Sequence, residues 1–186
     1  MVMVNLNLLF RSLHAALDAD DVDSLISLLI ELNLSFVPLG KPVDTNAFDR
    51  MLDLLDCSTG SGDGAWHVFG WFMSNGTALD DSQIRTLGLR IVELYPKFRN
   101  GLILSEVADW VGGWRDREAL MAVRAWVSDW KSLSSDAKRG VHVILRDMLD
   151  GSPLDLSPDD FAAARSIRDK CEQLMMQDRL GQTSLH

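Results

Sequence analysis

The chain has 186 residues, of which 47% are hydrophobic and 24% charged, and its formal net charge is −9. These proportions are typical of soluble globular proteins and exclude a largely disordered chain, a collagen-like repeat and a disulfide-stapled miniprotein. A chain of this length can bury roughly 70% of its unfolded surface, so we expect one domain over residues 1–186. The acidic balance disfavours nucleic acid as a partner, because phosphate contacts need clustered Lys and Arg.

The first 57 residues predict three helices, because apolar residues recur in them with a period of about 3.6. Asp20 or Asp21 can cap the second helix, and Asp44 marks the start of the third. The second helix also carries Leu28 and Ile30 outside its main stripe, which makes it apolar most of the way round and predicts an interior position. The stripes of the three helices are Leu6, Leu9, Phe10, Leu13 and Leu17; Val22, Leu25, Ile26, Leu29 and Leu32; and Phe48, Met51, Leu52 and Leu55.

Residues 58–64, Ser-Thr-Gly-Ser-Gly-Asp-Gly, form the stretch richest in small and flexible residues. Such a composition indicates a linker, so we expect a subdomain boundary here between acidic helices at 1–57 and Trp-rich helix pairs at 65–186. The Gly-x-Gly-x-Gly spacing is a weak match to a phosphate loop. It follows a helix where nucleotide-binding motifs require a strand, and we interpret it as a hinge.

Six more helices are predicted beyond the linker, and no convincing strand. They cover residues 65–73, Asp80 to Tyr95, the region of 103–114, about 116–130, 135–150 and the region after Ser157. Pro158 at a first turn and the acids after it are typical of a helix start. About nine amphipathic helices with short turns predict an all-α fold of antiparallel helix pairs, stacked as a short α-solenoid.

Pairs of tryptophans recur along these helices. Trp66 with Trp71 and Trp110 with Trp114 are spaced by a little over 40 residues, within the range of two-helix solenoid repeats. The run that includes Gly64-Ala65-Trp66, Asn75-Gly76, Ile84 to Tyr95-Pro96 and Ile103 to Trp114 resembles degenerate HEAT-like helical repeats. Small bacterial proteins contain such repeats, including immunity proteins of polymorphic toxin systems. The resemblance covers about residues 63–150 and implies a curved helical scaffold that binds another protein.

The negative charge is concentrated in the first third of the chain. Residues 1–64 hold ten acids and three bases, whereas residues 65–186 hold seventeen acids and fifteen bases. The densest cluster is Asp18, Asp20, Asp21 and Asp23. It does not match a calcium-binding EF-hand, because Asp23 and Leu29 stand where Gly and Glu are required. We expect helix capping to account for part of this cluster, and no metal.

The third predicted helix carries a second acidic group, Asp49, Asp53 and Asp56, opposite its apolar stripe. Like charges at this spacing destabilise an isolated helix by about 0.2–0.5 kcal/mol per pair. An acidic docking face is one interpretation and an ordinary solvated face is the other.

The helix at 65–73 has apolar residues on two faces, Trp66, Phe69 and Met73 on one and Val68, Trp71 and Phe72 on the other. It is either central or offers an aromatic patch. Because Trp is enriched at interface hot spots, we expect Trp71 to be an exposed anchor for a partner. Trp110 and Trp114 share a face with Ile103 and Val107 and are expected in the core.

Other chemistry is not indicated by the sequence. Cys57 and Cys171 have no metal-ligand spacing and predict reduced thiols in a cytoplasmic protein. No signal peptide or membrane span is expected. Neither an HExxH pattern nor a nucleophile elbow is present, so we expect no catalytic residues and no cofactor.

We therefore expect a cytoplasmic binding protein, a monomer or weak homo-oligomer, that neutralises a basic toxin or effector by occluding its site. The expected partner-binding residues are Asp18, Asp20, Asp21, Asp23, Asp49, Asp53, Asp56 and Trp71. Two alternatives stay open. One is a helical-bundle enzyme with a small-molecule pocket or with a metal held by the Asp cluster and His14. The other is an adaptor that self-associates through its aromatic helix.

Overall fold

A computed structural model describes residues 5–37, 42–114, 117–150 and 157–183, without the side chains of residues 109–114, 118 and 181–183. Over these ranges the fold is all-α, with no strand, as the sequence predicts. Three short 3-10 helices, η1 (Gly76–Ala78), η2 (Tyr95–Lys97) and η3 (Trp130–Ser132), follow α4, α5 and α7. The α-helices are α1 (Leu6–Asp18), α2 (Val22–Phe36), α3 (Thr45–Ser58), α4 (Asp63–Ser74), α5 (Asp81–Leu94), α6 (Gly101–Trp114), α7 (Arg117–Ser128), α8 (Ser135–Asp150) and α9 (Pro158–Thr183).

Polar side chains fix where several helices begin. Asp21 accepts a hydrogen bond from the backbone N–H of Ser24 and caps α2, and Asp44 caps α3 in the same way. Asp80 begins α5 with a capping box, because Asp80 and Gln83 each accept a hydrogen bond from the other's backbone N–H. Caps of this kind satisfy N–H groups that have no partner inside the helix. All three starts confirm the boundaries predicted from the sequence.

The chain divides into two compact units, Met1–Ile103 and Leu104–His186. This differs from the subdomain boundary expected at residues 58–64, which lies inside the first unit. The expected linker is held in place: Asn100 Nδ2 donates a hydrogen bond to the carbonyl of Gly62 at 3.0 Å. Gly64 is buried, and a Cβ there would lie 2.8 Å from Leu17 Cδ1. Gly64 therefore allows α4 to pack closely against Leu17 of α1.

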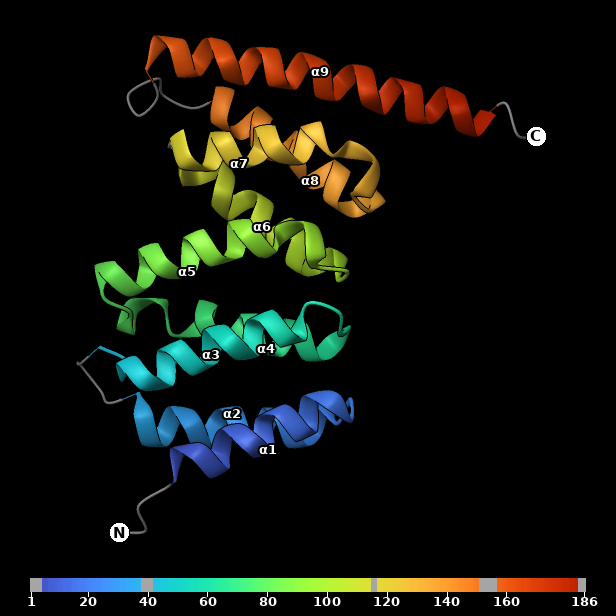
Figure 1. Cartoon of the computed structure of the whole chain (residues 1–186). Helices are drawn as coiled ribbons and strands as arrows, with labels where there is room; N and C mark the ends of the chain where they lie inside the picture. Colours follow the sequence, from blue (N-terminus) through green and yellow to red (C-terminus); the bar gives the residue numbers. More distant parts are fainter. Residues whose placement is uncertain (1–4, 38–41, 115–116, 151–156, 184–186) are drawn as a thin grey trace. The chain divides into compact units, whose positions relative to one another are not determined.

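In the first unit, α1 packs on α2 and α3, and α4 packs on α2 and α3 (Figure 1). The core between them is apolar and aromatic, with the Phe48 and Phe72 rings edge to face at 6.0 Å. α3 also contacts α5. Fully buried side chains in this unit include Leu13, Leu25, Leu32, Met51, Leu54, Leu55, Phe69, Ile91 and Tyr95.

The second unit packs α7, α8 and α9 against one another. Asp178, in the C-terminal half of α9, joins this helix to η3 and α8. Asp178 Oδ2 accepts hydrogen bonds from Trp130 Nε1 at 3.0 Å and from Lys138 Nζ at 2.8 Å. Lys138 also lies 5.4 Å from the centre of the Trp130 ring. Hydrogen bonds from Lys138 and Trp130 lower the pKa of Asp178.

Packing differs from the expectation for α2, and it is not described for two tryptophan side chains of α6. α2 is not interior, because Ile30 is 55% and Leu34 84% exposed. The presence of apolar residues around most of this helix therefore did not predict complete burial. The core positions expected for Trp110 and Trp114 fall outside the side chains that the structure describes, although Ile103 and Val107 on the same helix are buried.

Candidate functional site: an acidic end and a polarised groove

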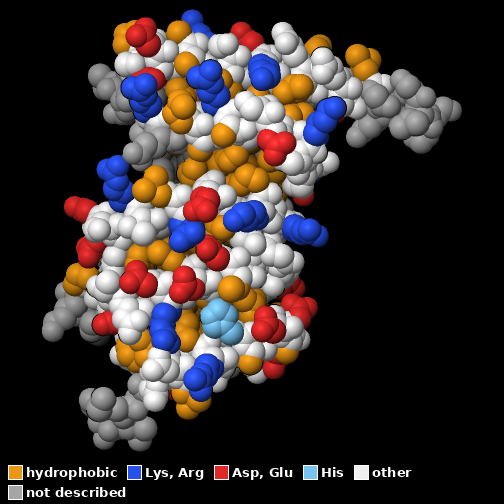
Figure 2. All heavy atoms as spheres, in the orientation of Figure 1, with side chains coloured by type: hydrophobic (Ala, Val, Ile, Leu, Met, Phe, Trp, Pro, Cys, Tyr) orange, Lys and Arg blue, Asp and Glu red, His pale blue; other side chains and the backbone are white. Residues whose placement is uncertain are grey.

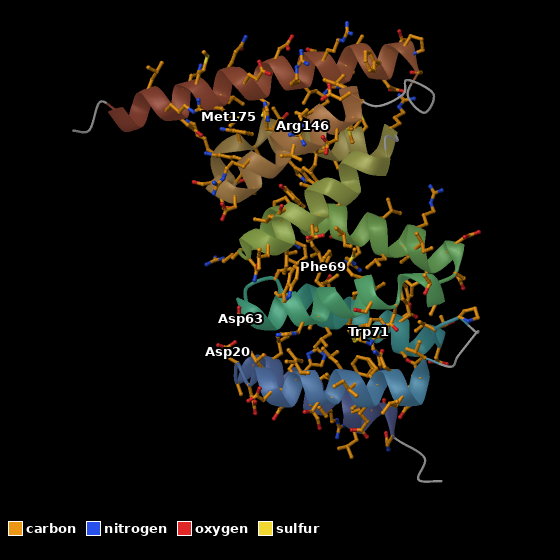
Figure 3. All side chains as sticks on the ribbon, turned by 180° about the vertical axis from the view of Figure 1, so that it is seen from behind. Asp20, Asp63, Phe69, Trp71, Arg146 and Met175 are labelled. Carbon is orange, nitrogen blue, oxygen red and sulfur yellow. The ribbon has the colours of Figure 1, made fainter. Side chains whose placement is uncertain are left out.

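The helices of the first unit bring six of the seven predicted aspartates to one end. α1 and α3 finish at this end and α2 and α4 start there, and Figure 3 shows Asp20 and Asp63 at the same end of their helices. Asp49 lies one turn after the start of α3 and does not belong to the group. We call the group the acidic end; it consists of Asp18, Asp20, Asp21, Asp23, Asp53, Asp56 and Asp63.

Two of these aspartates also shape the turn between α1 and α2. Asp20 has a φ of 53°, a left-handed conformation that Asp tolerates better than most residues. Asp21 is the cap of α2, and its hydrogen bonds with the side chain and backbone of Ser24 lower its pKa. The turn therefore holds two exposed carboxylates next to each other for local structural reasons, and the acidic end follows from helix capping as well as from composition.

The aspartates of this end influence the pKa of Cys57. Its thiol lies near the end of α3, and its pKa is raised first by burial and then by the charges of Asp56, Asp53 and Asp18. Three carboxylates from two helices thus act on one group. A raised pKa keeps the thiol protonated at neutral pH, which argues against a nucleophilic role for Cys57.

Asp56 is the exception at the acidic end, because it has its own counterion. Arg90 Nη1 lies 3.2 Å from Asp56 Oδ2. Burial raises the pKa of Asp56 while Arg90 opposes that shift, and Oδ1 is buried without a hydrogen-bond partner among the described residues. The expectation that Asp56 is free to attract a partner is therefore wrong. For Asp18, Asp20, Asp21, Asp23, Asp53 and Asp63, the described part of the chain supplies no ion pair.

Trp71 is not an exposed anchor. Only 4% of it is exposed, its ring meets that of Phe72 edge to face at 5.1 Å, and its indole N–H has no hydrogen-bond partner among the described residues. Both faces of α4 are covered because α2 and α3 pack against it. Phe69 is fully buried as well, Trp66 is half-buried, and Met73 is exposed.

A groove of about 700 Å³ runs between α1 and α3 and reaches the acidic end. Its lining includes Asp18 and Asp53, but also two basic side chains, Arg11 and Arg50, which the sequence did not single out. The sequence signal that could have indicated these residues is the helical spacing of polar side chains along one face of α1. Figure 2 shows both basic and acidic side chains around a histidine on the surface of the first unit. The lining residues are Asn7, Phe10, Arg11, His14, Ala15, Asp18, Arg50 and Asp53.

Arg50 is fixed in this groove by contacts with α1. One terminal nitrogen donates a hydrogen bond to the side-chain oxygen of Asn7, and the other donates to the carbonyl of Leu6 at 3.4 Å. The guanidinium also lies 5.4 Å from the centre of the Phe10 ring, within the range of a cation–π contact. These partners are neutral, so they orient the positive charge of Arg50 without cancelling it.

A smaller groove of about 310 Å³ lies in the second unit between α7 and α9. Arg124 and Lys170 flank it, with Ser128, Ser166 and the apolar side chains of Val127 and Ile167. The groove is therefore basic, whereas the one between α1 and α3 carries both signs of charge.

Among the described residues, no group of three or more His, Cys, Asp or Glu side chains is arranged to hold a metal ion. None of the described helices combines the length and the apolar character needed to cross a membrane. The chain matches no protein-family model, no curated protein and no solved structure.

Proposed function

We propose that this chain is a protein-binding module whose acidic end docks a basic partner. The observation that carries the proposal is the accumulation of carboxylates at one end of four helices, where Arg90 neutralises Asp56 and the described ion pairs leave the others unpaired. Clustered charge of one sign attracts a partner of opposite sign and raises its association rate. The partner surface that fits is one rich in Lys and Arg.

The HEAT-like resemblance, the charge and the predicted cytoplasmic location support a more specific version of this proposal. In that version the chain is an immunity protein that covers the active surface of a basic toxin or effector. Toxins that act on nucleic acid need a basic surface, because they bind phosphates. An acidic end that occupies this surface would block the substrate without any chemistry of its own.

The test compares two variants with the same change in net charge. Asp18→Asn, Asp20→Asn, Asp23→Asn and Asp53→Asn together weaken the acidic end but spare the Asp21 cap and the Asp56 ion pair. The control, Glu31→Gln, Asp49→Asn, Asp81→Asn and Glu106→Gln, removes four exposed carboxylates elsewhere. The probe is a fluorescent decalysine peptide, and binding is followed by fluorescence anisotropy at low salt.

We expect the acidic-end variant to lose at least tenfold in affinity for decalysine, and the control variant to lose much less. Each removed charge acts on several nearby lysines in the first case, whereas it acts from a distance in the second. Equal losses in the two variants would mean that decalysine responds to net charge alone. That result would contradict a docking surface at the acidic end.

A further inference from the structure

The groove between α1 and α3 keeps its positive and negative charges apart. Arg11 precedes Asp18 by seven residues on α1, which is about 10 Å along the helix axis at a rise of 1.5 Å per residue. On α3, Asp53 follows Arg50 by three residues, a spacing at which ion pairs form. Arg50 instead turns toward Asn7 and Leu6 of α1. Within the described residues no ion pair joins the bases of the groove to its acids.

The two helices run in the same direction, which places like charges together. Arg50, near the start of α3, contacts Asn7, near the start of α1, whereas Cys57, near the end of α3, is influenced by Asp18 at the end of α1. The basic end of the groove therefore lies at Arg11 and Arg50. Its opposite end is lined by Asp18 and Asp53, which belong to the acidic end of the unit. A ligand that is only basic would meet two guanidinium groups at one side.

We propose that this groove receives a helix of the partner that presents a carboxylate to Arg11 and Arg50 and, further along the groove, a basic side chain to Asp18 and Asp53. The inference rests on the proposed function and specifies what the partner must carry. Binding of a partner helix in a groove is a common recognition mode, with contacts from residues three, four and seven apart. Residues seven apart on a helix lie on one face about 10 Å apart, which matches the spacing of Arg11 and Asp18 on α1. The fixed position of Arg50 favours binding, because little side-chain freedom remains to be lost.

The experiment uses the full chain and three uncharged-background Ala/Gln helical peptides with capped ends. One carries Glu and Lys seven residues apart, the second carries Lys at both positions, and the third Glu at both. Binding is followed by NMR titration of the ¹⁵N-labelled protein at low salt. We expect the Glu/Lys peptide to shift the resonances of Arg11, His14, Asp18, Arg50 and Asp53, and to do so with an affinity at least about twofold higher than either other peptide shows at these residues.

Variants of the basic end then test the orientation. Arg11→Gln keeps a good helix former at an exposed position and is expected to weaken the Glu/Lys peptide about two- to fivefold, the range of an exposed ion pair, while strengthening the Lys/Lys peptide. Arg99→Gln is the control, because Arg99 is exposed and does not line the groove. Arg50→Lys keeps the positive charge but loses the two-sided hydrogen bonding to Asn7 and Leu6. We expect it to weaken binding of the Glu/Lys peptide less than Arg11→Gln does.

Two failures can be told apart. If the Lys/Lys peptide shifts the groove resonances with an affinity as high as that of the Glu/Lys peptide, or if Arg11→Gln leaves the Glu/Lys peptide unaffected, the groove inference is wrong; decalysine binding to the acidic end would still stand. If decalysine binding does not depend on the acidic-end carboxylates while the Glu/Lys peptide is preferred and is sensitive to Arg11, the groove holds and the basic-partner proposal fails. If no peptide shifts the groove resonances, the groove inference is overturned.

Discussion

Arg90 and Asp56 form an ion pair between α5 and α3, with 3.2 Å between the guanidinium and the carboxylate. Arg90 also lies 3.2 Å from Glu93 on its own helix. The pair removes one carboxylate from the acidic end and connects that end to the next helix of the first unit. It therefore has a structural role that the neighbouring aspartates do not share.

Asp56→Asn tests the cost of this half-buried charge. Because burial raises the pKa of Asp56 above its usual value of 3.8, the folded state favours the protonated form, and the stability contributed by this group increases as the pH falls through the raised pKa. We expect Asp56→Asn to change the free energy of unfolding at pH 7 by no more than about 1 kcal/mol in either direction, since the lost ion pair is worth little and the removed charge is one that burial disfavours. Arg90→Gln should be more harmful, because it leaves the charge without its counterion. Urea denaturation measures both, and a larger loss in Asp56→Asn contradicts this interpretation.

Because Trp71 is buried, we expect its substitution to affect the stability of the fold and not to affect partner binding directly. Trp71→Ala should lower the free energy of unfolding by about 3–5 kcal/mol, as expected for a large aromatic residue in a core. Trp71→Phe should cost less than about 2 kcal/mol, because it also removes a buried N–H without a partner, whose desolvation costs about 1–3 kcal/mol. Thermal or urea unfolding gives both values. If Trp71→Phe stays folded but loses decalysine binding, Trp71 has a role at the surface after all.

The glycines at residues 58–64 differ in what surrounds them. Gly64→Ala should lower the free energy of unfolding by about 1–2 kcal/mol, because the new methyl group must displace Leu17 at the contact of α4 with α1. Gly60→Ala meets open space and should be neutral or stabilising by up to about 1 kcal/mol, since it restricts the unfolded chain. The two variants form a matched pair in one denaturation series. A hinge throughout this stretch would instead make them equally harmless.

The hydrogen bonds of Asp178 should make the stability of the second unit depend on pH. Its pKa is lowered below the usual 3.8 by hydrogen bonds from Lys138 and Trp130, so its stabilising contribution is complete above about pH 5 and decreases as the pH falls below 3.8. Because the Asp178 side chain is 43% exposed and its interactions are screened by solvent, we expect Asp178→Asn to lower the free energy of unfolding at pH 7 by no more than about 1 kcal/mol, and the difference from the unchanged protein to shrink toward pH 3. Asp169→Asn is the control, since its carboxylate is exposed and pairs with neighbouring Arg168. A difference that grows on acidification would contradict the assignment.

The sequence predicted the all-α fold and several helix starts because these depend on local signals. Asp44 and Asp80 were identified as starts from residues within one turn of them, and the caps form there. The same local origin explains why the acidic end could be anticipated. The aspartates between α1 and α2 are neighbours in the chain before they are neighbours in space.

The remaining features depend on residues far apart in the chain, and these could not be predicted. Asp56 finds Arg90 thirty-four positions later, and the contact of Arg50 with Asn7 spans forty-three. Trp71 could not be assigned either, because both faces of α4 are apolar and spacing alone does not say which neighbouring helices cover them. The groove depends on the packing of α1 beside α3, which the sequence alone does not indicate.

The most direct test of the central claim is the association rate of a small basic protein, such as lysozyme, measured by stopped-flow fluorescence between low and physiological ionic strength. Carboxylates gathered at one end should steer the encounter, so the rate constant should fall about tenfold or more as salt increases. The variant carrying Asp18→Asn, Asp20→Asn, Asp23→Asn and Asp53→Asn should lose most of this dependence, and the control variant with Glu31, Asp49, Asp81 and Glu106 neutralised should keep it. A rate constant that does not change with salt, or that changes equally in both variants, would contradict the account.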